Sequence, residues 1–263
     1  MRNVLGRGTA VPGVGYYGQL LLLGWFANSV SWFRLGDAYR AYLYSSEQCV
    51  SFARTMGTIM AERFLDALLV ALLLLVATLL LISRGQGASW PVLGMALVLL
   101  ALVAAMLLAM GRARGWLVRR LPRRLADYYQ HFHEGTLGSF RQMPAATLWG
   151  GLGWLVEVGR LYLVVQALGL DLGLPLVIFL ALANSLLTLA PTPGGVGAVE
   201  SGMVGLVVQL SPLTTSSAAA LVVVDRAITY LSIVAFGALL FLARQGVRRR
   251  GLGVNQPKPL GPQ

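Results

Sequence analysis

The chain has 263 residues, of which 57% are hydrophobic and only 12% are charged, and its mean hydropathy is +0.71. These values exclude an ordinary soluble globular domain and predict an integral membrane protein. The formal net charge is +11. In an apolar chain such an excess favours cytoplasmic loops that contact anionic lipid headgroups and disfavours nucleic-acid binding.

Seven apolar segments follow one another along the chain. After the first, residues 14–33, no small-residue cleavage site is visible, so we expect no cleavable signal peptide. The uncharged run 90–110 is long enough to cross the hydrocarbon core as a helix. Residues 198–210 are too few to cross, which predicts a re-entrant or interfacial helix. The other segments are 64–82, 144–168, 174–190 and 217–242.

Two basic stretches set the expected orientation. One is the loop of about residues 111–142 and the other is the tail 244–263, and both are assigned to the cytoplasm. The loop fits either a basic interfacial helix bent at Pro122 or a solvated loop. The tail is expected to be disordered because it is rich in Pro and Gly and ends without apolar periodicity. The transmembrane domain is therefore residues 1–243.

Between these stretches the chain must cross the membrane an even number of times. Segments 144–168 and 217–242 meet this condition if 174–210 dips in from the outer side and turns at 191–197, where "PTPGGVG" breaks the helix. Two further complete spans would meet it equally well. Non-helical backbone at membrane depth requires cover by protein or a wet cavity.

A weak internal repeat relates the two halves of the chain. The tripeptide Ala-Asn-Ser occurs at 27–29 and 183–185, late in an apolar segment, and a glycine-containing break with an acid follows each copy. A span with an acid–arginine pair comes next, Glu62-Arg63 in one half and Asp225-Arg226 in the other. Because these spans would run in opposite directions, we expect inverted copies, as in many transporters, with the first copy entering from the cytoplasm.

Ionisable residues inside apolar segments are informative because each costs about 2.5–3.5 kcal/mol at the centre of a membrane helix. Glu157 and Arg160 lie three residues apart on one face deep within 144–168. Asp225 and Arg226 also lie well inside their segment, whereas Glu62, Arg63 and Asp66 start theirs and could reach the interface. Two interpretations stay open: the charges pair only to specify packing, or they line a polar path.

Polar residues near the two breaks extend this pattern. Glu200 opens the short helix 198–210, where a carboxylate suits the helix N-terminus. It is either a cap or a partner for Arg160 or Arg226. Near the first break, Asp37 and Arg40 share one helical face, with Arg34 just before them.

Enzymatic and metal chemistry find no support in the residues. Cys49 is the single cysteine, and His131 and His133 point to different sides of a helix, so we expect no metal site. No nucleophile, base and orienting acid stand in a recognisable arrangement, and "GGVG" lacks the lysine of a phosphate-binding loop. We expect no enzyme activity and no cofactor.

Four segments, "FANSVSWFRLGDAYRAYL", "ERFLDALLVALLLL", "PTPGGVGAVE" and "DRAITYL", resemble the successive signatures of the lysylphosphatidylglycerol synthase transmembrane-region family of flippase-like membrane proteins. Relatives flip aminoacylated phosphatidylglycerol or act in lipid-linked glycan pathways. The resemblance implies functional roles for Arg34, Asp37, Arg40, Glu62, Arg63, Asp66, Glu200 and Arg226.

The chain departs from this family pattern in several places. Relatives usually have two spans before the segment that begins here at Val14, and no aminoacyltransferase domain follows here, which disfavours lysyl transfer. The stretch "SWFRLGD" lacks the proline usual before the Arg-x-Gly-Asp element, which disfavours a helix break there. Asp225 stands where relatives more often have an aromatic residue.

These observations predict an all-α, polytopic membrane bundle with broken or re-entrant helices and an inverted repeat. We expect a multi-pass protein of a prokaryotic cell membrane that translocates or handles anionic or aminoacylated phospholipids or lipid-linked headgroups. The alternative is a non-transporting subunit that anchors a lipid- or glycan-modifying enzyme, and a homo-oligomer is a further possible assembly. The expected headgroup-binding or gating residues are Arg34, Asp37, Arg40, Glu62, Arg63, Asp66, Glu157, Arg160, Asn184, Pro193, Gly194, Gly195, Gly197, Glu200 and Arg226.

Overall fold

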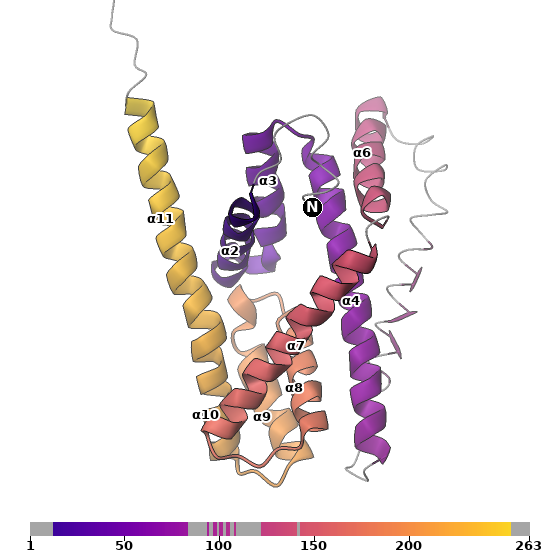
Figure 1. Cartoon of the computed structure of the whole chain (residues 1–263), viewed down its shortest axis with the longest axis vertical. Helices are drawn as coiled ribbons and strands as arrows, with labels where there is room; N and C mark the ends of the chain where they lie inside the picture. The colour runs from indigo at the N-terminus through magenta and orange to yellow at the C-terminus, as the bar shows by residue number, and fades with distance from the viewer. Residues whose placement is uncertain are drawn as a thin grey trace, which may run out of the picture.

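The computed structural model describes residues 13–83, 122–140 and 143–253, together with isolated positions between 94 and 108. Within this part of the chain the regular elements are helices, without a strand (Figure 1). The all-α membrane bundle expected from the sequence is thereby confirmed. The basic N-terminus and most of the predicted span 90–110 lie outside the described residues.

Among the described residues, three helices are long and apolar enough to cross a membrane: Phe52–Leu80 within α4 (Phe52–Ser83), Ala146–Ala167 within α7 (Met143–Ala167), and Thr215–Gly246. The third joins α10 (Thr215–Arg226) to α11 (Ser232–Gly253) through a π-helical turn, η3 (Ala227–Leu231). The expected spans 144–168 and 217–242 are therefore present.

The helix α4 begins earlier than the apolar run 64–82 indicated. It starts at Phe52 and carries Glu62 and Arg63 in its interior, roughly 15 Å from its first residue at 1.5 Å per residue. The expectation that these side chains sit at the start of their span is wrong. The charged residues interrupt the hydropathy pattern without interrupting the helix, because their side chains are paired as described below.

Two broken helical hairpins lie between the long helices. The first consists of α2 (Val14–Val30), the 3₁₀ turn η1 (Trp32–Arg34) and α3 (Gly36–Gln48). The second consists of α8 (Leu174–Leu187), the 3₁₀ turn η2 (Pro193–Gly195) and α9 (Ala198–Leu210). The hairpins enter from opposite ends of the long axis of the molecule, and their turns η1 and η2 meet near its middle (Figure 1). Descent of both from one duplicated unit stays a prediction.

The first break forms although it lacks the proline usual in the family pattern, whose absence disfavoured a break here. Phe33 adopts φ 60°, in the left-handed region, and the Ser31 hydroxyl donates to the carbonyl of Ala27. The Asn28 Oδ1 accepts the Gly36 amide at 2.8 Å and so bridges the break from one helix to the next. Side-chain hydrogen bonds therefore replace proline as the means of ending α2.

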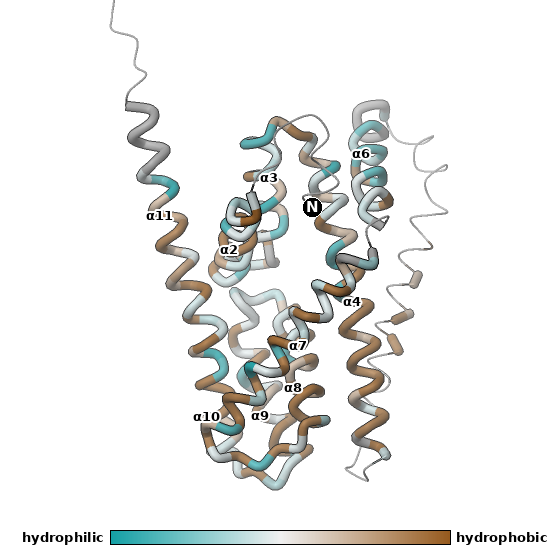
Figure 2. The backbone as a smooth tube through the Cα atoms, viewed as in Figure 1, coloured by the Kyte–Doolittle hydropathy of each residue, from teal (hydrophilic) through white to brown (hydrophobic). Residues whose placement is uncertain are grey.

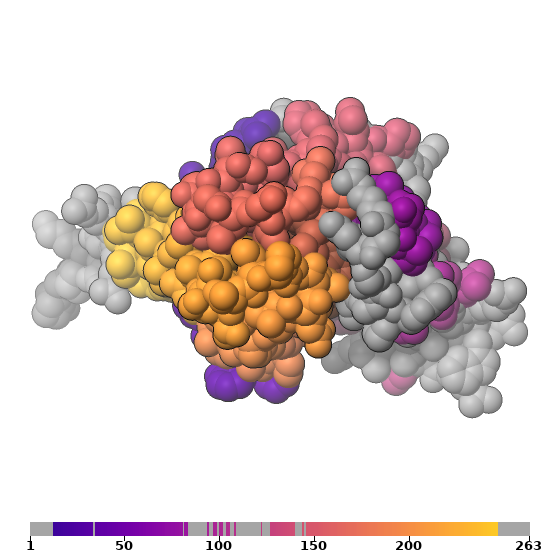
Figure 3. Space-filling model, turned by 90° about the horizontal axis from the view of Figure 1, so that it is seen from below, coloured from indigo at the N-terminus to yellow at the C-terminus, as the bar shows by residue number. Residues whose placement is uncertain are grey.

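The apolar core surrounds α8, which is buried on most sides. Val177, Phe179 and Leu180 are at most 1% exposed and pack within a cluster that also draws on α4, α7, α9 and α10. Seen from the lower end, α7 to α10 cover this end of the molecule together (Figure 3). Large apolar side chains such as Trp149 and Phe236 remain exposed on the outer faces of α7 and α11. These faces suit contact with lipid tails.

The helix α6 (Arg123–Phe140) corrects the expected loop at about 111–142. It follows Pro122 and stands beside the first half of α4, where a Cβ added to Gly57 would lie 2.1 Å from the carbonyl oxygen of Phe132 (Figure 1). A solvated loop does not describe this close helix packing, whereas an interfacial position of the helix stays a prediction. Figure 2 shows polar residues along α6 and apolar residues along the lower half of α4. Residues 109–121 and 141–142 lie outside the described part.

The C-terminal boundary also differs from the expectation of a disordered tail from residue 244. The helix α11 continues to Gly253, and Arg244 donates to both carboxylate oxygens of Glu47 at 2.8 Å, which ties α11 to the end of α3. Residues 254–263 lie outside the described part.

Candidate functional site

The second break is built on glycines with positive φ. Gly194, Gly195 and Gly197 have φ of 58°, 73° and 87°, a region that side chains with a Cβ rarely adopt. Gly194 has a second constraint, since an added Cβ would lie 2.3 Å from Cε2 of Tyr230. After the break, the Glu200 Oε2 accepts the Gly197 amide at 2.6 Å and caps α9. The predicted cap is therefore present.

Arg226 connects the last span to this break. Its Nη2 donates to the Gly194 carbonyl and its Nε to Glu200 Oε1, both at 2.8 Å. The guanidinium carbon lies 4.7 Å from the centre of the Tyr230 ring, a cation–π distance. Glu200 is thus both a cap and an ion-pair partner, and its arginine is Arg226. The broken backbone exposes a carbonyl that a continuous helix would have used, and the arginine takes it.

Arg160 lies between two carboxylates. Its Nη2 donates to Glu157 Oε1 at 2.6 Å and its Nε to Glu157 Oε2 at 3.3 Å, while its Nη1 is ion-paired with Asp225. Asp225 is 4% exposed, so this contact is shielded from solvent. The pairing joins α7 to α10 across 65 residues of sequence.

A further charged group joins α3 to α4. Arg40, 3% exposed, contacts both carboxylate oxygens of Glu62, at 3.3 and 2.8 Å. Arg63 lies within 3.4 Å of Asp37, 3.2 Å of Glu62 and 3.6 Å of Asp66. The side chain of Arg34 lies outside the described part, although its backbone belongs to η1.

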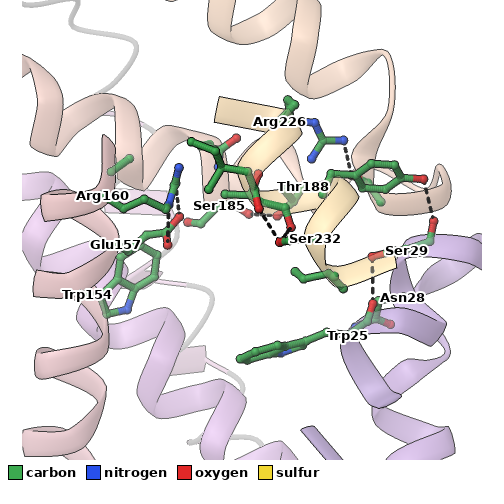
Figure 4. Close-up of a pocket in the computed structure, with 17 residues that line it drawn as sticks. Trp25, Asn28, Ser29, Trp154, Glu157, Arg160, Ser185, Thr188, Arg226 and Ser232 are labelled. Atoms are coloured by element: carbon green, nitrogen blue, oxygen red, sulfur yellow. Dashed lines mark hydrogen bonds and ion pairs between the residues drawn. The ribbon is translucent and has the colours of Figure 1, made fainter. Parts of the chain in front are cut away.

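A cavity of about 580 Å³ opens beside Arg160 and Arg226, with α7 on one side and α2 on the other (Figure 4). Five of the predicted residues line it: Glu157, Arg160, Asn184, Gly194 and Arg226. Residues from α2, α8 and the π turn complete the wall. The structure therefore brings residues next to both breaks, together with Glu157, Arg160 and Arg226, to one cavity.

The remaining predicted residues whose side chains are described do not line this cavity. Pro193, Gly195, Gly197 and Glu200 shape the wall behind Gly194 and Arg226. The group formed by Asp37, Arg40, Glu62, Arg63 and Asp66 lies on α3 and α4, away from the cavity wall. Trp154 connects the two places, because its Nε1 donates to Asp66 at 3.0 Å while its ring lines the cavity.

Several cavity residues were not singled out from the sequence. Trp25 and Trp154 gave no signal, since an aromatic residue in a membrane helix most often contacts lipid or core. Asn28, Ser29 and Ser185 belong to the repeated Ala-Asn-Ser tripeptide, which marked the right places, although only Asn184 was retained as a site residue. A search for polar residues shared by the two repeats would have found them.

The cavity combines opposite charges with an unsatisfied acceptor. The Asn184 Oδ1 is buried without a hydrogen-bond partner among the described residues, and a buried polar atom of this kind generally meets a water or a ligand. Its counterpart in the first hairpin, the Asn28 Oδ1, accepts the Gly36 amide at the break. No group of three potential metal-ligating side chains occurs within the described ranges.

Comparisons with known proteins agree with this architecture. A UPF0104 membrane protein of Methanocaldococcus jannaschii is 29% identical over 224 residues, which cover 82% of this chain and 93% of the relative. A UPF0104 membrane protein of Methanothermobacter thermautotrophicus is 24% identical over 227 residues, which cover 77% and 67%. No solved structure matches the chain. The model of the lysylphosphatidylglycerol synthase TM region matches residues 2–237, and the chain belongs to this family of membrane proteins.

Proposed function

We propose that the protein binds the headgroup of an anionic or aminoacylated phospholipid, or of a related lipid-linked compound, and transfers it across the membrane. The observation that carries the proposal is the cavity of about 580 Å³ where the two broken hairpins meet, lined by Arg160, Arg226 and Asn184. A bundle with an apolar outer surface gains nothing for its own stability from such a cavity. Polar cavities of this kind between broken helices serve transport in many membrane proteins.

Arg226 is the group best placed to meet a phosphate. Its Nε and Nη2 are held by Glu200 and Gly194, whereas Nη1 has no partner among the described residues. The guanidinium is thus oriented before a ligand arrives, which reduces the entropy lost on binding. A phosphate oxygen at Nη1 would form a charge-assisted hydrogen bond, about twice as strong as a neutral one.

Another part of the wall suits a group that donates hydrogen bonds. The Asn184 Oδ1 lacks a donor, and the Glu157 side chain is 37% exposed. An amine or a hydroxyl of the headgroup would supply that donor. No covalent step is needed for such handling, and we propose that the chain is not an enzyme and acts in the cell membrane as a multi-pass protein.

Transfer between leaflets tests this proposal. The purified protein in liposomes is given fluorescent phosphatidylglycerol, and the fraction that reaches the opposite leaflet is measured by quenching with a membrane-impermeant reductant. Wild-type protein should accelerate transfer over empty liposomes. Arg226→Ala should slow it about 10-fold or more, since a hydrogen bond to a charged group is worth about 1.5–3 kcal/mol.

A matched control removes an arginine from an exposed ion pair. Arg54 pairs with Glu134 at 2.6 Å, and both side chains are about half exposed, so Arg54→Ala should transfer lipid at the wild-type rate. Arg226→Lys keeps the charge but loses the forked donors and should fall between the two. Equal rates for wild type and Arg226→Ala would reject the proposal. Stable co-purification with a lipid- or glycan-modifying enzyme, without transfer, would favour the anchoring role.

A further inference from the structure

One short stretch of the last span donates hydrogen bonds to both broken hairpins. The last carbonyls of a helix have no partner within that helix, and those next to a break must find one elsewhere. The carbonyl of Ser29, in the last turn of α2, accepts the hydroxyl of Tyr230 at 3.2 Å. The carbonyl of Gly194, in η2, accepts Arg226 Nη2 at 2.8 Å. Both donors lie in or next to the π turn η3, Ala227–Leu231.

Tyr230 also contacts Arg226, the other donor, and both broken hairpins. Its ring occupies the space in which a Gly194 side chain would lie, and the Arg226 guanidinium stacks on it at 4.7 Å. Its hydroxyl reaches the carbonyl of Ser29 in α2 at 3.2 Å. One side chain thus contacts the first hairpin, the second hairpin and the arginine that we assign to the headgroup. Single π turns within α-helices are frequently found at functional sites.

We propose that Tyr230 is a positioning residue that joins the two hairpin turns, and that a headgroup phosphate on Arg226 loosens this joint. The inference rests on the proposed function. A phosphate that binds at Nη1 draws the guanidinium away from the neutral Gly194 carbonyl, because a hydrogen bond to a charged acceptor is about twice as strong as one to a neutral acceptor. Movement of Arg226 toward the phosphate also removes it from the Tyr230 ring. Headgroup binding is then coupled to separation of η1 from η2, the step that a path across the membrane requires.

The test measures how often the joint opens. Ser29 borders the cavity but is only 6% exposed, so a cysteine there should react faster with a water-soluble thiol reagent when the turns separate. Ser29→Cys is made in a Cys49→Ser background, because Cys49 is exposed and is the single natural cysteine. Labelling is followed in phosphatidylcholine liposomes, with and without phosphatidylglycerol.

Tyr230→Phe keeps the ring on Gly194 and removes only the hydroxyl. Labelling should become about fivefold faster, the factor that corresponds to about 1 kcal/mol for one neutral hydrogen bond. Tyr230→Leu also removes the ring and should accelerate labelling further. The control Tyr128→Phe removes a hydroxyl from an exposed tyrosine of α6 and should leave the rate unchanged. Phosphatidylglycerol should accelerate labelling of the protein with Tyr230 and Arg226 intact, but not of the Arg226→Ala variant.

The outcomes separate this inference from the proposed function. Equal labelling with Tyr230 and with Tyr230→Phe overturns the joint, whatever the transfer assay shows. A labelling rate that is the same with and without phosphatidylglycerol overturns the coupling between headgroup binding and separation of the turns. Absence of lipid transfer by wild-type protein, together with a clear effect of Tyr230→Phe on labelling, would reject the proposed function and leave the joint in place.

Discussion

Gly194→Ala is the substitution for which the structure allows the most detailed prediction. Two separate terms oppose an alanine at this position. The backbone has φ 58° and ψ 18°, and a left-handed conformation costs a residue with a Cβ about 1–2 kcal/mol. The new Cβ would also lie 2.3 Å from Cε2 and 2.8 Å from Cδ2 of Tyr230. Forcing an extra methyl group into a packed site costs about 1–3 kcal/mol.

The sum is a loss of about 2–5 kcal/mol in the free energy of unfolding. For a chain of this size each kcal/mol lowers the melting temperature by about 2–4 °C, so the midpoint should fall by roughly 4–20 °C. The assay is thermal unfolding of the purified protein in detergent, followed by tryptophan fluorescence. Lipid transfer should fall as well, because Gly194 lines the cavity and its carbonyl orients Arg226.

Gly169→Ala supplies the matched control. Gly169 has φ 65° at the end of α7, but no atom lies within 4 Å of an added Cβ, so only the backbone term applies. Its loss should be about 1–2 kcal/mol. In a Tyr230→Ala background, Gly194→Ala should lose only the same backbone term. If Gly194→Ala is as mild as Gly169→Ala, or if Tyr230→Ala gives no relief, the packing of Tyr230 on the break is refuted.

Three further substitutions probe the bundle. Asp225→Asn removes the buried charge beside Arg160 and should lower the free energy of unfolding by about 1.5–3 kcal/mol, measured by thermal unfolding; an unchanged midpoint would argue against the ion pair. Gly57→Val should separate α4 from α6 and lower stability by about 1–3 kcal/mol, and a stable variant with native lipid transfer would contradict the close crossing. Trp154→Phe leaves Asp66 without its indole donor, so it should lower the free energy of unfolding by about 1 kcal/mol and slow lipid transfer. Transfer at the wild-type rate would argue against a role for Trp154 in the cavity.

The short second hairpin was predictable because its signals are local. Pro191, Pro193 and three glycines cannot continue an α-helix, and the following apolar run is too short to cross a membrane. The helix α9 has the bounds that the apolar run indicated, Ala198–Leu210. Local chemistry also marked Glu200 as the cap of this helix. Residues that break a helix, and an acid placed at a helix N-terminus, can both be recognised in a single sequence.

Tertiary partners could not be predicted in the same way. Arg160 and Asp225 are 65 residues apart, and nothing in their local sequence distinguishes this pairing from Arg160 with Glu200. The start of α4 was missed because hydropathy drops at Glu62 and Arg63, whose charges pair with Arg40 and Asp37 of α3. The first break was doubted because its cause is not proline but a hydrogen-bonded serine and asparagine. The first two misses concern contacts between elements distant in sequence, whereas the third concerns short-range side-chain hydrogen bonds.

The central structural claim is that the two broken hairpins enter from opposite faces of the membrane and meet at one cavity. Side-specific thiol labelling tests it directly, because the natural Cys49 is exposed at the end of α3 and Thr215 is exposed at the start of α10. An impermeant reagent should label Cys49 only from the cytoplasmic side, and Thr215→Cys in a Cys49→Ser background only from the outer side. Labelling of both positions from the same side would contradict the architecture.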